Sequence, residues 1–87
     1  MMLLTNQTTD ITSPIMRHYG GNLTFQCGGV FGSATVTVNQ SMDRITWLPA
    51  FIFTAAGARN IIGLNSTYFQ ASQVGSTGTT NITLVAG

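Results

Sequence analysis

The chain has few side chains that could perform acid–base, nucleophilic or metal chemistry. Its side-chain carboxylates are Asp10 and Asp43, its imidazole is His18 and its thiol is Cys27. Acid–base catalysis needs a second group within hydrogen-bond reach, and neither aspartate has an evident partner in the sequence. A metal site needs several His, Cys or carboxylate ligands, which one histidine cannot supply. The sequence therefore predicts that the protein is not an enzyme and binds no metal and no cofactor.

The charge pattern also limits the possible partners. Charged residues make up 6% of the sequence, with a net charge of +1 and arginine as the only strongly basic residue type, whereas an ordinary domain is about 25% charged. Nucleic-acid binding needs clustered Lys and Arg, so we expect no nucleic-acid partner. Low net charge and edge strands without lysine favour association, so we expect a homo-oligomer or another partner that covers the edges, with coverage by the chain's own loops as the alternative. A lineage-wide composition bias is the alternative reading.

The segment 34–39 has the clearest strand pattern. Apolar Ala34, Val36 and Val38 alternate with polar residues, which is typical of a half-buried strand. Turn-forming side chains follow at 39–43, and we expect a return strand at 44–48. Pro49 should end that strand or place it at a sheet edge.

The remaining chain repeats this organisation. Short apolar or alternating segments occur at 15–19, 22–28, 51–54, 59–64, 66–72 and 81–85, separated by glycine-rich turns. Such spacing favours an all-β fold, a small antiparallel β-sandwich or barrel, formed by residues 11–87 as a single domain. Cys27 is in phase with apolar neighbours and is expected to be a small core residue. The expected core consists of Leu23, Phe25, Val36, Val38, Ile45, Trp47, Phe53, Ile62, Leu64, Ile82 and Leu84.

Residues 1–10 show no strand periodicity and are expected to form an extended N-terminal arm. Met1, Met2, Leu3 and Leu4 form an apolar tip before a polar run. We expect this tip to contact a partner, in which case deletion of the arm leaves the sandwich folded; a tip that folds back would instead add to the core. The tip does not resemble a signal peptide, and no apolar run reaches the roughly 18 residues of a membrane span, so we expect a soluble protein without a membrane partner.

Five Asn-x-Ser/Thr sequons are present, which begin at Asn6, Asn22, Asn39, Asn65 and Asn81. A glycosylated surface protein would use such sites. Asn and Thr also crowd together in polar strand faces and turns, and this interpretation is favoured for a chain without a signal-peptide pattern.

Several segments resemble small bacteriophage virion structural proteins of the capsid decoration or cement type. The resemblance lies in segments 20–26, 29–38, 41–47 and 53–57, with a Thr-Trp strand and a Phe-Thr-Ala-Ala-Gly loop among its motifs. It covers about half of the chain, and none of its motifs is catalytic. Asp43-Arg44 stands where the family pattern has Asp-Gly, which predicts a wider or displaced turn.

The resemblance implies a virion structural protein that binds and stabilises the major capsid shell. Its partners would be the major capsid protein and copies of itself, and it would reside in the virion after assembly in the host cytoplasm. The alternative is a tail or fibre component that acts as a receptor- or glycan-binding module. A flat polar face would favour the first function, and exposed aromatic residues in a groove beside Asn or Asp would favour the second.

Overall fold

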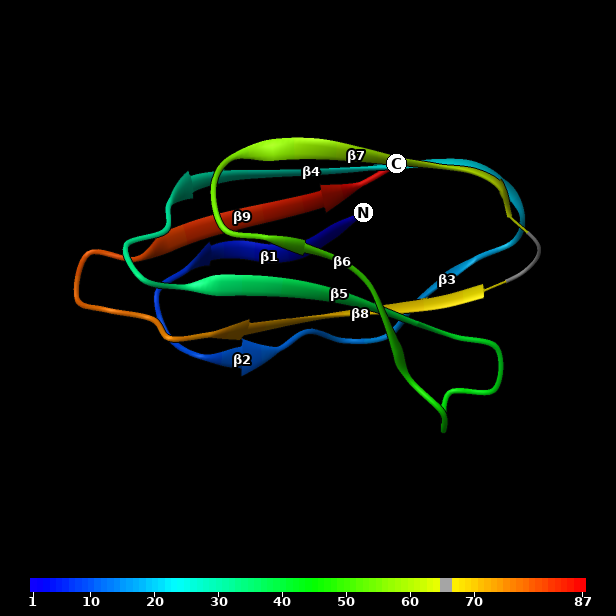
Figure 1. Ribbon diagram of the computed structural model, residues 1–87, viewed down its shortest axis with the longest axis horizontal. Helices are drawn as coiled ribbons and strands as arrows, with labels where there is room; N and C mark the ends of the chain where they lie inside the picture. The colour runs from blue at the N-terminus through cyan, green and yellow to red at the C-terminus, as the bar shows by residue number, and fades with distance from the viewer. Residues whose placement is uncertain (65–66) are drawn as a thin grey trace.

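Antiparallel strands in two sheets form the protein, as seen in the computed structural model, which describes residues 1–64 and 67–87 (Figure 1). The first sheet has the order β1-β9-β4-β7, formed by Met2–Gln7, Asn81–Ala86, Gly21–Val30 and Gly57–Leu64. The second has the order β2-β8-β5-β6, formed by Ile11–Thr12, Thr67–Val74, Thr35–Ser41 and Leu48–Phe53, and β3 (Met16–His18) also pairs with β8. The expected all-β sandwich is confirmed.

The connectivity of the two sheets is that of a jelly roll. β2 and β3 both pair with β8 and act as one interrupted strand. Apart from the β2–β3 and β5–β6 connections, each step along the chain leads from one sheet to the other. With β2 and β3 counted as one strand, each sheet has four strands, and this order is that of the jelly-roll form of the β-sandwich.

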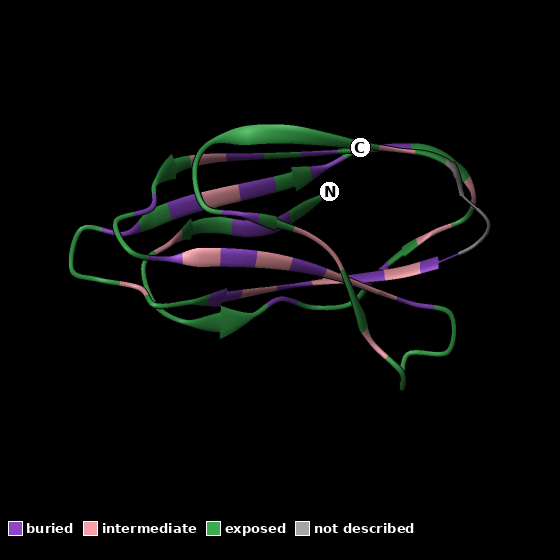
Figure 2. Ribbon diagram, viewed as in Figure 1, coloured by how far each residue is buried: buried purple, intermediate pink, exposed green. Residues whose placement is uncertain are grey.

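The core lies between the sheets, where alternate residues of each strand point inward. Figure 2 shows buried residues alternating with half-buried ones along β5, and a similar alternation along β8. The Phe25 ring is fully buried, and its centroid lies 5.2 Å from those of Phe51 and Phe69 in edge-to-face geometry. The expected burial is confirmed for Leu23, Phe25, Cys27, Val36, Val38, Phe53, Ile82 and Leu84.

Two expected core residues are exposed instead. Ile62 is 77% exposed because its neighbour Ile61 pairs with Leu23 and packs against the core. Ile45 is 82% exposed because residues 42–47 form a loop and not a strand. Trp47 is half-buried in the same loop, and the side chain of Leu64 lies outside the described residues.

The expectation of an arm at residues 1–10 is wrong. Met2–Gln7 is strand β1 and pairs antiparallel with β9, and Leu3 and Leu4 are buried in the core. The register shifts between Met2 and Leu4, so that both leucines of an adjacent pair point inward. This β-bulge interrupts the alternation of inward and outward side chains in β1, so the sequence shows no alternating strand pattern in residues 1–10.

Strand β6 lies at the edge of its sheet, where Pro49 is tolerated. Pro49 pairs with Asn39 beside a register shift, and β6 has a neighbour on one side only. The expected edge position of Pro49 is confirmed. The expected return strand at 44–48 is wrong, since β6 begins at Leu48 and a six-residue segment, 42–47, connects it to β5.

Candidate interaction site

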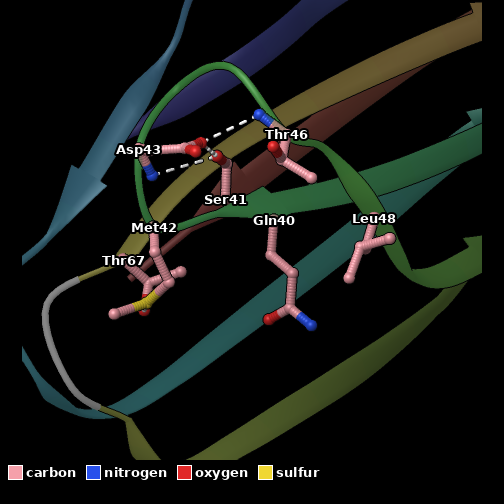
Figure 3. Close-up of a pocket in the computed structure, with 7 residues that line it drawn as sticks. All are labelled: Gln40, Ser41, Met42, Asp43, Thr46, Leu48 and Thr67. Atoms are coloured by element: carbon pink, nitrogen blue, oxygen red, sulfur yellow. Dashed lines mark hydrogen bonds between the residues drawn. The ribbon is translucent and has the colours of Figure 1, made fainter.

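The loop between β5 and β6 is held in shape by its own side chains. The Asp43 Oδ1 atom accepts hydrogen bonds from the backbone N–H group of Thr46 and from the Ser41 hydroxyl, each at 2.8 Å (Figure 3). It also accepts one from the backbone N–H group of Ile45 at 2.8 Å. The Ser41 Oγ atom in turn accepts from the N–H groups of Asp43 and Arg44. Together these bonds satisfy the turn backbone, so the loop has a defined conformation before it meets any partner.

The same hydrogen bonds stabilise an uncommon backbone conformation at Arg44. Its φ angle is +63°, in the left-handed region that side chains other than glycine rarely adopt. Such a residue costs about 1–3 kcal/mol and persists only where its surroundings hold it, often at functional sites. Here the Arg44 N–H group donates to the Ser41 hydroxyl at 2.9 Å, which fixes the turn.

A hollow of about 330 Å³ opens beneath this loop. It is lined by Gln40, Ser41, Met42, Asp43, Thr46, Leu48 and Thr67. In Figure 3 the side chains of Gln40, Met42 and Leu48 point to one side of the β5–β6 hairpin. Met42 is 70% exposed and Leu48 is 61% exposed. The hollow thus presents flexible apolar side chains at the surface, a composition that suits protein contacts.

Arginine and tyrosine side chains gather beside the loop and form what we call the arginine–tyrosine cluster: Arg17, Tyr19, Arg44 and Tyr68. Arg17 pairs directly with Tyr68 across β3 and β8, so both side chains share one sheet face. The Arg17 guanidinium carbon lies 4.7 Å from the Tyr19 ring centroid and 5.4 Å from that of Tyr68. Arg44 reaches the Tyr68 ring from the loop, at 5.2 Å. The Tyr68 ring therefore lies in cation–π contact with two arginines.

The cluster and the loop 42–47, together with Leu48, make up one end of the molecule, which we call the loop end. It holds both tyrosines, the single tryptophan and two of the three cationic side chains of the chain. Trp, Tyr and Arg are the residues most enriched among interface hot spots, and Met is enriched at interfaces. The loop end therefore has the composition of a protein-binding surface.

The N-terminal residues expected at a partner interface divide into two groups. Leu3 and Leu4 are buried within the domain's own core and are not available to a partner. Met1 and Met2 are 59% and 49% exposed, and Met2 pairs with Val85 across β1 and β9. Contact of Met1 and Met2 with a partner stays a prediction.

The described residues bring together no set of catalytic groups. They contain no group of three or more His, Cys, Asp or Glu side chains that could hold a metal ion. Burial raises the pKa of the Cys27 thiol to about 11, which keeps it protonated and unreactive at neutral pH. No helix in residues 1–64 and 67–87 is long and apolar enough to cross a membrane.

Asp10, the other aspartate, serves the opposite end of the sandwich. Its Oδ1 atom accepts a hydrogen bond from the Ser76 N–H group at 2.8 Å, which is the main cause that lowers the pKa of this carboxyl. At the same end of the sandwich, the side-chain amide of Gln73 is fully buried and donates to the backbone carbonyls of Gln7 and Thr9. Asp10 and Asp43 are thus separate loop anchors and do not form an acid–base pair.

The arginine–tyrosine cluster was not found from the sequence, because its members are far apart in the chain. Arg17 and Tyr68 meet through the register of β3 and β8, and Arg44 joins them only because the loop turns back. The Ser41-x-Asp43 spacing was the available signal, since both residue types form local side-chain-to-backbone turns.

Comparison of the chain with known protein families, with curated proteins and with solved structures gives no significant match. The fold and the loop geometry therefore define the class on their own: a jelly-roll β-sandwich with a loop at one end that its own side chains hold in shape.

The Asp43 network predicts a pH-dependent change at the loop. Backbone N–H groups of Thr46 and Ile45 lower the pKa of the Asp43 carboxyl to about 2, against about 4 in an unfolded chain. Because the folded pKa is the lower one, the stabilisation is present above about pH 4 and is lost as the pH falls toward 2. We expect the fluorescence of Trp47, the single tryptophan, to change over this interval.

Two asparagine variants separate this effect from other acid-induced changes. Asp43→Asn removes the titrating group, so its Trp47 signal should be flat between about pH 4 and pH 2. Asp10→Asn is the matched control and should keep the transition, because Asp10 anchors a different loop. An Asp43→Asn protein with the wild-type transition would show that the loop does not depend on this carboxylate.

Proposed function

We propose that the protein is a virion structural protein of the capsid decoration or cement type, which binds the major capsid protein through its loop end. The observation that carries this proposal is the concentration of interface-type side chains on a loop already held by Asp43 and Ser41. A preformed loop loses little conformational entropy on binding, which favours a stable complex. Function as a binding component agrees with the scarcity of titratable groups in the chain.

Two further observations support the proposal. Segments 20–26, 29–38, 41–47 and 53–57 resemble small virion structural proteins. Jelly-roll sandwiches are used in viral capsids and in lectins, although a fold alone does not determine function. The middle of the outer face of the second sheet is also polar, with Thr37 and Asn39 on β5 beside Ser72 and Gln70 on β8, and the exposed Ile52 and Val74 lie next to it.

Quantitative mass spectrometry of purified virus particles tests the proposal. We expect the chain to remain with the particles through density-gradient purification, in a fixed ratio to the major capsid protein. A chain found only in the soluble lysate, or in variable trace amounts on particles, would contradict the function.

The proposal includes association between copies of the chain. One sheet ends in β1 and β7 and the other in β6 and the interrupted strand of β2 and β3, and the chain has no lysine to guard such edges. Sedimentation at high concentration should give a mass of several 9.2 kDa chains, with a trimer as candidate. A stable monomer under these conditions would contradict this part of the proposal.

A tail or fibre component that binds a receptor or glycan is the second candidate. The observation that favours it is the Tyr19 ring, which is 78% exposed and could stack on a sugar. Immunogold labelling of particles separates the two candidates, because a decoration protein labels the head and a fibre component labels the tail.

A further inference from the structure

Two of the three arginines of the chain face a single tyrosine ring. The guanidinium carbons of Arg17 and Arg44 lie 5.4 Å and 5.2 Å from the Tyr68 ring centroid. Arg59 lies on β7 in the other sheet. Since the chain contains no lysine, most of its positive side-chain charge is concentrated at the loop end.

Asp43, the carboxylate nearest to Arg44 in sequence, does not pair with the Arg44 guanidinium. The Asp43 Oδ1 atom accepts three hydrogen bonds from its own loop. Within residues 1–64 and 67–87, the Arg44 guanidinium contacts the Tyr68 ring and no carboxylate. Asp10 lies beyond the far end of β8, beside Ser76, and the strand from Tyr68 to Val74 spans roughly 20 Å.

We propose that the arginine–tyrosine cluster binds carboxylate side chains of an acidic patch on a partner protein. A guanidinium can donate two parallel hydrogen bonds to a carboxylate with its edge while its face stays stacked on an aromatic ring. Stacking on Tyr68 restricts both arginines before binding, so less side-chain entropy is lost when the carboxylate arrives. The inference rests on the proposed function and names the chemistry of the surface that the loop end contacts.

The partner that fits this cluster is a different protein and not a second copy of the chain. A second copy offers two side-chain carboxylates, Asp10 and Asp43. Asp43 is used by its own loop, and Asp10 lies at the opposite end of the sandwich. Neither aspartate belongs to an acidic patch, because the chain contains no further Asp and no Glu. The exposed Ile45 and Leu48 beside the cluster provide apolar contacts around the charged groups.

A titration with a hexaglutamate peptide tests the proposal without any virus particle. The side-chain Nε–Hε signals of the arginines are followed by NMR in the intact protein at low salt. We expect the peptide to shift the signals of Arg17 and Arg44 and to leave that of Arg59 in place. Arg44→Gln should weaken binding roughly tenfold, the usual effect of losing a charge-assisted hydrogen bond.

Two matched variants distinguish a built site from general charge attraction. Arg59→Gln removes the same charge from β7 and should bind the peptide as the wild type does. Arg44→Lys keeps the charge but loses the planar fork, so its affinity should lie between those of the wild type and Arg44→Gln. Equal weakening by Arg59→Gln and Arg44→Gln, or no weakening by either, would overturn the proposal.

Sialyllactose and heparin oligosaccharides serve as alternative anionic probes. If they shift the cluster signals and hexaglutamate does not, the site recognises an anionic glycan and the proposal is wrong. The outcome is independent of particle association: a protein absent from particles refutes the proposed function, whereas a particle-bound protein with a peptide-insensitive cluster refutes only this inference.

Discussion

Deletion of residues 1–7 is expected to unfold the protein. The deletion removes β1, whose Leu3 and Leu4 are 5% and 2% exposed in the core, and leaves β9 as a bare edge. Burial of each leucine contributes about 1.5–3 kcal/mol, while a small domain is stable by only about 5–15 kcal/mol in total. Circular dichroism should show loss of the strand signal and of the cooperative thermal transition.

Point variants in the same strand provide the control. Leu4→Ala should lower the free energy of unfolding by about 2–5 kcal/mol, because it leaves a cavity in the core. Met2→Ser should change it little, since Met2 is 49% exposed on the outer face of the sheet. A truncated chain that keeps the wild-type strand signal and thermal transition would show that β1 is dispensable and would restore the idea of a free arm.

Phe25→Ala is expected to be the most damaging single substitution in the core. The Phe25 ring is fully buried and makes edge-to-face contacts with Phe51 and Phe69, so it links the two sheets. Removal of a buried phenylalanine costs about 3–5 kcal/mol, and each lost aromatic pair adds about 0.5–1.5 kcal/mol. Urea unfolding measures the change in the free energy of unfolding.

One aromatic and one aliphatic variant serve as references for the free-energy change of Phe25→Ala. Trp47→Ala should cost less than Phe25→Ala, because Trp47 is only half-buried in the β5–β6 loop. Ile62→Ala should be close to neutral, because this side chain is 77% exposed on β7. If Ile62→Ala were as damaging as Phe25→Ala, the register assigned to β7 would be wrong by one residue.

Sequence patterning predicted those strands whose alternation is unbroken. Alternate side chains are apolar in residues 23–27 of β4, in residues 34–38 at the start of β5 and in residues 82–86 of β9, and these segments bury Phe25, Val36 and Leu84 as expected. Patterning failed where a bulge or an adjacent apolar pair gave two possible registers. In β1 a bulge buries two consecutive leucines, and in β7 the pair Ile61 and Ile62 fits either face.

The candidate site was less predictable than the fold because it depends on tertiary pairing. Hydrogen bonds that the Asp43 and Ser41 side chains accept from backbone N–H groups turn the segment 42–47 away from the expected strand. The meeting of Arg17, Arg44 and Tyr68 depends on the pairing of β3 with β8 and on that turn. Residue types alone favoured association with a partner, and the structure identified which end carries the aromatic and arginine side chains.

Rebinding of the protein to virus particles stripped of it tests the account most directly. We compare the wild type with a double variant at the loop end, Ile45→Ser with Leu48→Ser, and with a control, Val30→Ser with Val74→Ser. The exposed fractions are 82% and 61% at the loop end and 55% and 53% in the control. Val74 pairs with Thr35 at the start of β5, whereas the loop follows Ser41 at its other end (Figure 1).

The account predicts saturable rebinding of the wild type and of the control, and a loss of affinity of roughly tenfold or more for the loop-end variant. All three proteins should have similar thermal transitions, because the substituted side chains are exposed. A loop-end variant that rebinds as tightly as the wild type, or a wild type that does not rebind at all, would contradict the claim that this end attaches the protein to a capsid.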